Sequence, residues 1–411
     1  MQPYSRVIRN TAILVVLAGS GVPARGDMIT DWNETAIQVT ATPPNALLQA
    51  RVLATAHLAM LEALNAVGGV AKSYAVEVKA PKGASREAAV AAAAHGVLAR
   101  MTHGQQESLD AALAASLAGV PAGQTKTDGI SVGTEVAEKL VALRRSDGAD
   151  ARTSFTTRKG AGRWQPTPPQ NAPAVLPHWG AVKPFVLESA AQFAVKGPPP
   201  IGSDRYMQDL AEVKKLGARR STVRTADQTA AAIFWTIQTL VPWNAAGRAA
   251  AKARGNTLEE NARLFAALNA ACSDAHVAGF EIKYRLQHWR PVTAIRAAAE
   301  PGSADEGWEP LLATPAHPEY PSTHAACSGA AEAVLKGFFG RDEVAVSVLH
   351  PPVFGVTRTY ASFSQIAQEV DDARVWGGIH FRTADVDGRD LGRRIGEYVL
   401  KALSAPPVVS K

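Results

Sequence analysis

The chain has 411 residues, 46% of them hydrophobic, enough to bury a sizeable core in one large or several smaller units. Lysine and arginine (43) exceed aspartate and glutamate (37) only slightly, and no polybasic tail or basic stripe with interleaved aromatics occurs. We therefore expect no nucleic-acid partner.

The first residues are typical of an export signal. Early arginines precede a short apolar run at 11–18, and the small residues Ala24 and Gly26 offer a cleavage site. The run is too short to span a bilayer, and no other segment approaches that length. The alternative is a buried N-terminal helix, but nothing amphipathic follows directly. We predict a signal peptide at 1–26, an exported (periplasmic or secreted) chain and no integral membrane segment in the mature chain.

Apolar residues spaced three and four apart predict helices in the first half. Glycine and proline separate these helices. They are expected at 45–67, 85–101, 108–117 and 130–143. The histidines of this half, His57, His95 and His103, are isolated from other polar residues. We interpret them as surface or hydrogen-bonded core residues.

Between residues 148 and 203 the helical pattern fails and proline dominates. Loops this long are uncommon in compact proteins. Trp164, Trp179 and Phe185 argue against a disordered linker, because such linkers are poor in aromatic residues. We predict an ordered connection packed on the helices.

Helical periodicity resumes in the second half and no convincing set of alternating strands occurs. Helices are expected at 204–216, 225–238, 243–254, 257–289, 322–339, 362–375 and 383–403. The predicted fold class is all-α, with two four-helix-bundle-like halves. The N-terminal bundle and its connection would occupy 27–203, and the C-terminal bundle 204–411. The sequence leaves a homo-oligomer open.

Two cysteines, Cys272 and Cys327, lie in alanine-rich helical stretches. An exported chain could pair them, although a small buried thiol is the commoner fate of such residues. Pairing stays open, because sequence does not give the separation of their Cα atoms.

Two cations, Lys283 and Arg290, lie near the end of the helix predicted at 257–289 and just after it. Lys283 and Arg290 are seven residues apart, so on a helix they would point the same way, roughly 10 Å apart. Burying two cations on one face is costly unless an anion lies beside them. A solvated basic face is the alternative.

A helix start follows at Pro321-Ser322-Thr323-His324, with Ser322 or Thr323 as N-cap. A helix N terminus directs free N–H groups and partial positive charge at whatever lies before it, which suits an oxyanion. His324, in the first turn, could exchange a proton with that anion. The alternative is an ordinary N-cap.

Arg374 and His380 are six residues apart and would not share a helical face. Gly377 and Gly378 indicate that the helix ends and the chain turns before His380. Both side chains can then converge on one point.

Together the three pieces, Lys-x6-Arg-Pro, Pro-Ser-x-His and Arg-x5-His, resemble the vanadium-dependent haloperoxidase and type 2 phosphatidic acid phosphatase superfamily. Their flanks resemble its exported bacterial haloperoxidase-like branch, most clearly over about 202–403. The resemblance implies an all-helical fold with two four-helix bundles. It also implies a site in the second bundle for vanadate, which phosphate could replace.

By matching motif positions, the resemblance implies that His380 is the axial ligand of vanadate. Lys283, Arg290 and Arg374 would neutralise the vanadate oxygens. Three cations and two imidazoles beside a capped helix form a preorganised oxyanion cage.

In the same resemblance, the Ser322 hydroxyl and the Thr323 backbone N–H are further donors, and His324 is the acid–base group. The family usually has Gly where this chain has Thr323, whose side chain could narrow the pocket. The residue before the last arginine is usually Ser and is Ala373 here, so one hydrogen bond is expected to be missing.

The cage supports two reactions. In a haloperoxidase, hydrogen peroxide binds at the vanadate, His324 removes a proton, Lys283 polarises the peroxide and halide becomes hypohalous acid. In a soluble exported acid phosphatase, His380 would attack a phosphate monoester to form a phosphohistidine, and His324 would protonate the leaving oxygen. We favour the haloperoxidase, because the whole-chain likeness is to that branch. A third alternative is a non-catalytic helical protein with a relict phosphate cage.

His317 lies where chloride-oxidising relatives often carry Phe and bromide-oxidising ones carry His. The resemblance therefore favours bromide or iodide. Trp289 either lines the pocket or is a buried aromatic. His276, two turns before Lys283, is interpreted as an ordinary buried histidine in preference to a second layer around the cage.

Overall fold

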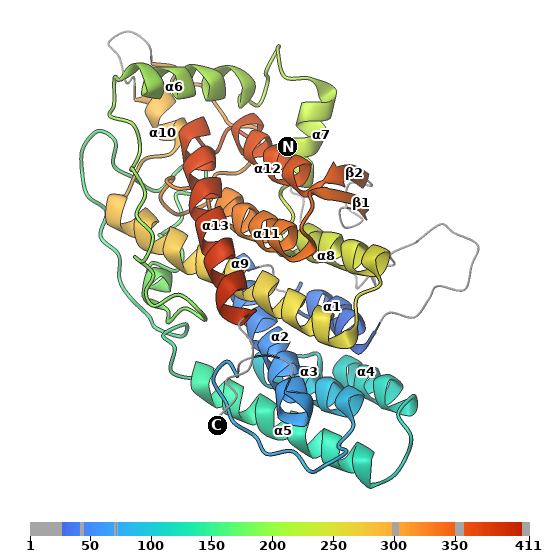
Figure 1. Ribbon diagram of the computed structural model, residues 1–411. Helices are drawn as coiled ribbons and strands as arrows, with labels where there is room; N and C mark the ends of the chain where they lie inside the picture. The colour runs from blue at the N-terminus through green and yellow to red at the C-terminus, as the bar shows by residue number, and fades with distance from the viewer. Residues whose placement is uncertain are drawn as a thin grey trace.

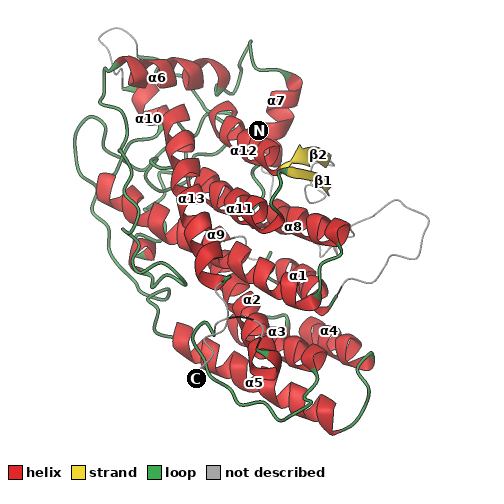
Figure 2. Ribbon diagram, viewed as in Figure 1, coloured by secondary structure: helices red, strands yellow, loops and turns green. Residues whose placement is uncertain are grey.

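The computed structural model describes residues 27–41, 45–69, 71, 73–297, 304–349 and 357–404. The predicted signal peptide at 1–26 lies outside the described residues. Helices dominate the described part and strands form one small sheet there, as Figure 2 shows, which confirms the all-α prediction. The helices are α1 Met28–Val39, α2 Ala46–Gly68, α3 Arg86–Met101, α4 Gln106–Ala118, α5 Gln124–Arg144, η1 Trp179–Ala181, α6 Asp204–Leu216, α7 Ala226–Phe234, α8 Leu240–Arg254, α9 Leu258–Leu286, α10 Pro291–Arg296, α11 Thr323–Phe339, α12 Phe363–Trp376 and α13 Arg382–Leu403.

Most predicted helices end within a few residues of the observed bounds. Helix α5 begins earlier than predicted because Gly129 does not break it. That glycine instead permits close packing, since an added Cβ would lie 3.0 Å from the Ala88 Cβ on α3. Helices α1 and α10 were not predicted, and α7 ends at Phe234, before the predicted 238.

The prediction of no strands was wrong at one hairpin. Strand β1 (Glu343–Leu349) pairs antiparallel with β2 (Thr357–Ser362). The inward residues of β1 are the buried valines 344, 346 and 348. The outward positions include the small residues Ala345 and Ser347. The alternation of apolar and polar residues in the sequence is therefore weak and covers one short strand.

The long helix α9 runs between two groups of helices (Figure 1). On one side it packs against α1 and α2, and α2 packs in turn on α3 and α5. On the other side it packs against α8, α11 and α13. Because α9 packs against both groups, the division into units at 27–203 and 204–411 stays a prediction.

Helix α13 approaches α11 through a stripe of glycines. An added Cβ at Gly388, Gly392 or Gly396 would collide with carbonyl oxygens of α11 or of Ser322 just before it. Two glycines of α5 face α3 in the same way. The small residues let the backbones meet directly, which fixes the first turn of α11 against α13.

The proline-rich connection is ordered, as predicted. Trp164 and Trp179 are buried, and the connection is anchored to α9 by Asp274. The Asp274 carboxylate accepts hydrogen bonds of 2.6 to 2.9 Å from three successive backbone N–H groups of residues 185–187. Burial raises the pKa of Asp274 to about 6, and these donors partly oppose the shift.

His57 is a hydrogen-bonded core residue, as predicted. Its Nδ1 lies 2.7 Å from the Leu53 carbonyl oxygen, and its Nε2 lies 2.9 Å from the Asn33 side-chain nitrogen. Asn33 also donates to Asn244, so the histidine belongs to a buried polar network that joins α1, α2 and α8. Burial lowers the pKa of His57 to about 4, which keeps it neutral.

Helix α2 is the one helix in the described part that could cross a membrane by length and composition. Its most apolar window is 89% buried among the other helices, as expected of a core helix.

Replacing Gly392 by alanine should destabilise the fold, because its Cβ would meet the backbone carbonyl of Ala326 and α13 would have to move. Overpacking of this kind costs about 1–3 kcal/mol. Thermal and urea unfolding should show the loss. In the control Gly337→Ala, the nearest atom is the flexible Leu400 Cδ2 at 2.6 Å, so the loss should be clearly smaller. Equal stability of both variants would contradict the stripe's role.

Candidate functional site

The sequence predicted Lys283 and Arg290 on one face of a single helix, and the structure differs from this prediction. Helix α9 ends at Leu286, because Gln287 adopts a left-handed conformation (φ 55°) and its N–H closes on the Lys283 carbonyl. Arg290 is the extended N-cap of α10, with Pro291 at the first helical position. The two cations therefore converge through a chain turn.

Lys283 is fully buried at the end of α9. Its Nζ donates to the backbone carbonyls of Pro318, Glu319 and Pro321 at 2.5 to 3.1 Å. All three donors of the ammonium are thereby used to fix the segment before α11. Direct contact with an anion would replace one of these bonds.

Arg290 connects two other segments of the site, those that carry His317 and His380. Its Nε and Nη2 donate to the backbone oxygen and Nδ1 of His317, each at 3.0 Å. Its Nη1 donates to the Ile379 carbonyl at 2.7 Å and lies 3.2 Å from His380 Nε2. His317 also lies 5.3 Å, ring centre to ring centre, from Phe280. One buried guanidinium thus places His317 and His380 around the same space.

Helix α12 ends as predicted before His380. Gly377 caps it, and Gly378 has a positive φ of 76°. A Cβ at Gly378 would also lie 2.9 Å from the Pro310 Cβ, so this turn requires glycine. Arg374, in the last turn, donates from Nη1 to the Trp235 carbonyl at 2.8 Å.

Ser322 is the N-cap of α11, and its hydroxyl accepts from the Ala325 N–H at 3.4 Å. Thr323 directs its Cγ2 at α9, where a Cβ added to Gly279 would lie only 2.7 Å away. The Thr323 methyl therefore occupies space left by Gly279. The expectation that the Thr323 side chain could narrow the pocket stays a prediction.

His324 follows on the first turn of α11, partly exposed. Its Nε2 is buried without a hydrogen-bond partner among the described residues. Burial lowers the pKa of His324 well below its usual range, and Arg374 and His276 lower it further. The imidazole is therefore held in its neutral form.

The cage concentrates positive charge away from water. Burial lowers the pKa of Arg290 and of Arg374 to about 10 each, and lowers that of Lys283 well below its usual range. Mutual repulsion adds to the shift of Lys283 and Arg290. Each shift means that the charged form is destabilised, which a bound anion would reverse.

Two orphaned nitrogens, the donor Arg374 Nε and the ring atom His324 Nε2, test whether an oxyanion fits. Among the described residues, Arg374 Nε and His324 Nε2 have no hydrogen-bond partner although both atoms are buried. Such groups are rare unless a ligand or water satisfies them. Together with the α11 N terminus they suit a tetrahedral or trigonal-bipyramidal oxyanion such as phosphate or vanadate.

Glu319 was not singled out from the sequence. It is fully buried, and its Oε1 lies 2.8 Å from His380 Nδ1 and accepts from the Phe381 N–H at 3.0 Å. Burial raises the pKa of Glu319 to about 7, against the opposing effects of Arg290 and Lys283. The partners are 61 positions apart, so sequence spacing gave no signal.

Four other residues singled out from the sequence are buried in the structure. Trp289 is buried in an apolar cluster with Tyr206 and Phe381. His276 is buried on α9, with Nδ1 unpaired among the described residues, and burial lowers its pKa to about 4. Cys272 and Cys327 are buried free thiols, the commoner of the two expected outcomes.

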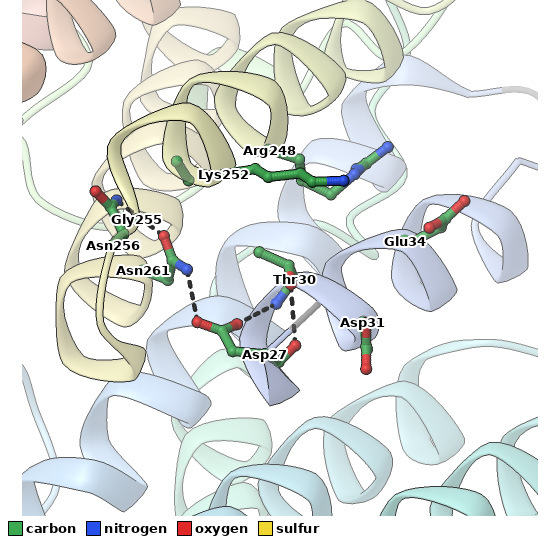
Figure 3. A pocket seen from close by; sticks show the side chains of 10 residues that line it. Asp27, Thr30, Asp31, Glu34, Arg248, Lys252, Gly255, Asn256 and Asn261 are labelled. Carbon is green, nitrogen blue, oxygen red and sulfur yellow. Dashed lines mark hydrogen bonds between the residues drawn. The ribbon is translucent and has the colours of Figure 1, made fainter. Parts of the chain in front are cut away.

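A separate surface pocket of about 380 Å³ opens beside α1, α8 and the start of α9 (Figure 3). Its charges are mixed, with Asp31 and Glu34 on one side and Arg248 on the other. Asp27 is already bonded to the Thr30 N–H and the Asn261 amide at 2.9 and 2.6 Å. None of its lining residues belongs to the cage, and we assign it no catalytic role.

Comparison with known proteins gives a consistent result. Residues 263–406 match a family model described as the VCPO second helical-bundle domain. A vanadium chloroperoxidase of Curvularia inaequalis is 32% identical over 88 residues, which span 19% of this chain and only 14% of that relative.

Solved structures match over nearly the whole length. The first bacterial vanadium-dependent iodoperoxidase superimposes with a TM-score of 0.76 at 28% identity, covering 92% of this chain and 95% of that one. The holo form of a bacterial vanadium-dependent chloroperoxidase gives 0.73 at 18% identity, covering 92% and 97%, and supports the fold.

The Thr323–Gly279 contact predicts a compensating pair. Gly279→Ala should lose about 1–3 kcal/mol of stability by overpacking. Combined with Thr323→Ser, which removes only the Cγ2 methyl, most of that loss should be recovered. A double-mutant cycle from chemical denaturation measures the coupling. Additive effects of the two changes would show that the methyl does not occupy this space.

Arg374 Nε, unpaired among the described residues, predicts that a bound oxyanion stabilises the folded protein. Inorganic phosphate at about a hundred times its dissociation constant should add roughly 2.7 kcal/mol and raise the thermal midpoint. Arg374→Ala should abolish most of this rise. Arg285→Ala is the control, because Arg285 is bonded to Glu281 on the exposed side of α9. A phosphate effect that both variants retain would exclude the cage as its source.

Proposed function

Because the chain belongs to the vanadium haloperoxidase superfamily, we propose that it is an exported vanadium-dependent haloperoxidase that oxidises bromide or iodide with hydrogen peroxide. The observation that carries the proposal is that two buried cations, Lys283 and Arg290, bond to the segment that leads into α11, with Arg290 also 3.2 Å from His380 Nε2. Export rests on the signal-like composition of residues 1–26.

The residues divide into those that hold the cofactor and those that handle protons. His380 Nε2 would hold vanadate, with Arg290, Arg374 and Lys283 neutralising its charge. The Ser322 hydroxyl and the Thr323 N–H would add donors. When bound, vanadate supplies the Lewis-acidic centre that activates hydrogen peroxide toward halide.

His324 is suited to the proton step. Its Nε2 is unpaired among the described residues, and the low pKa of the ring keeps it a base at neutral pH. It would take the proton that peroxide loses on entering the cage. Arg374 would hold the developing negative charge through its Nε, which has no partner within the described part of the chain, and Lys283 would act through its charge or by exchanging one backbone hydrogen bond.

Two observations support the choice of halide. His317 accepts a hydrogen bond from Arg290 through Nδ1, so a polar ring stands where the chloride-oxidising relatives often carry Phe. The whole-chain similarity to an iodoperoxidase points the same way.

The proposal predicts that the mature protein, loaded with orthovanadate, oxidises bromide and iodide faster than chloride in the presence of peroxide. His380→Ala should lower this rate at least 100-fold, because no other imidazole nitrogen takes its place. Second-layer effects alone typically reach 10–100-fold. The control His95→Ala, on a histidine paired with Asp110 in the other helix group, should leave the rate unchanged.

A parallel assay of p-nitrophenyl phosphate hydrolysis without vanadate separates the alternatives. Phosphate release that depends on His380, with no halide oxidation, would replace the proposal by the phosphatase. Inactivity in both assays, with an intact fold and normal phosphate binding, would indicate a relict cage.

A further inference from the structure

We propose that Glu319 is a positioning residue that locks His380 in the Nδ1–H tautomer and so directs the lone pair of Nε2 at the bound oxyanion. The role of His380 rests on the proposed function, but the tautomer does not. Two contacts on opposite sides of the imidazole agree on it, and the shorter one, from Glu319, is the one that fixes it.

The first contact is on the Nε2 side. Arg290 Nη1 lies 3.2 Å from His380 Nε2, and a guanidinium can only donate hydrogen bonds. This contact favours a lone pair on Nε2, but it is longer than the 2.7 Å bond of the same Nη1 to the Ile379 carbonyl and does not fix the tautomer by itself. With a lone pair on Nε2, the proton of a neutral imidazole is on Nδ1.

The second contact receives that proton. Glu319 Oε1 lies 2.8 Å from His380 Nδ1 and also accepts from the Phe381 N–H at 3.0 Å. A backbone N–H can only donate, so Oε1 acts as an acceptor. The Nδ1–H of His380 points at the same oxygen, and the two contacts agree.

The backbone of Glu319 is fixed from both sides. Its N–H donates to the His288 carbonyl at 2.9 Å, and its carbonyl accepts from Lys283 Nζ at 2.8 Å. Both side chains of the pair are almost completely buried, at 3% and 0% exposure. Water therefore does not compete for the Nδ1–H, and the imidazole cannot turn without breaking several bonds.

The second carboxyl oxygen, Oε2, has no partner among the described residues. Glu319 borders a cavity of about 10 Å³ shared with Tyr206, Asp209 and His288. That volume is close to the least that holds one water molecule. The carboxyl group is thus reserved for His380 and Phe381, with room for one further hydrogen bond.

A carboxylate behind a ligating histidine sets its tautomer and increases the basicity of the other ring nitrogen. Loss of such partners typically weakens ligand affinity by about 10–100-fold. Glu319 comes from the segment before α11, whereas His380 precedes α13. The contact therefore also joins two walls of the cage.

The test uses the full chain with ¹⁵N-labelled histidine and no vanadate. Long-range ¹⁵N–¹H correlation spectra should show His380, assigned by its loss in His380→Gln, as the Nδ1–H tautomer. In Glu319→Met, which keeps the volume and removes the acceptor, the ring should change to Nε2–H or to a mixture. Calorimetric affinity for orthovanadate, and separately for inorganic phosphate, should fall about 10–100-fold.

Two further variants keep the test decisive. Glu319→Gln retains the acceptor and loses the charge, so it should restore the wild-type tautomer and part of the affinity, even if Glu319→Met folds poorly. Asp128→Asn changes a partly exposed acid of α5 that bonds to Gln124, and should alter neither readout.

A wild-type tautomer in Glu319→Met, or a Glu319→Gln variant with the Nε2–H tautomer, would overturn the proposal. So would unchanged vanadate and phosphate affinity in Glu319→Met. Because none of these readouts uses halide oxidation, failure of the haloperoxidase assay would leave the result for Glu319 intact.

Discussion

The burial of three cations around one small space is the constraint on which the rest of the site depends. Lys283 and Arg290 are fully covered and Arg374 nearly so. Isolated charges in such surroundings are costly unless they are paired or hydrogen-bonded. The chain meets this demand with backbone carbonyls and with two buried acids, Glu319 and Asp385, which act on the cations.

The walls of the cage stay in place because helices approach one another through small residues. Gly388 and Gly392 bring α13 onto the start of α11, and Gly279 receives the methyl of Thr323. Gly378 allows the tight turn before His380. Each contact is made by backbone or by a short side chain, so few rotamers are available to loosen the donors. Rigid placement of donors is what oxyanion stabilisation requires.

Much of this was predictable from the sequence because helical periodicity and the three motifs are local signals. The turn at Gly377 and Gly378 and the cap at Ser322 follow from residue types alone. The end of α9 was not predictable, because Gln287 in a left-handed conformation is unusual for a residue other than glycine. Its side chain and backbone bond to the proline-rich connection, at Arg158 and Trp164, and these distant contacts accompany the turn.

Glu319 and Gly279 show a different limit. Glu319 lies two residues before the Pro-Ser-x-His motif, yet its partner is determined only once two segments meet in space. Gly279 carries no pattern at all, since a glycine within a long helix has many explanations. Both gain a role through a neighbour that is remote in the sequence. Pairwise contacts of this kind are outside what composition and spacing can supply.

The position of α9 has a consequence for how the molecule can be divided. One side of this helix packs on α2 and the other on α11 and α13, and Asp274 on the same helix anchors the long connection. A fragment beginning at residue 204 would leave the α2-facing side uncovered, with apolar surface exposed to water. The segment 263–406, matched by the family model, begins inside α9 itself. The matched segment therefore begins within a helix that packs on both helix groups.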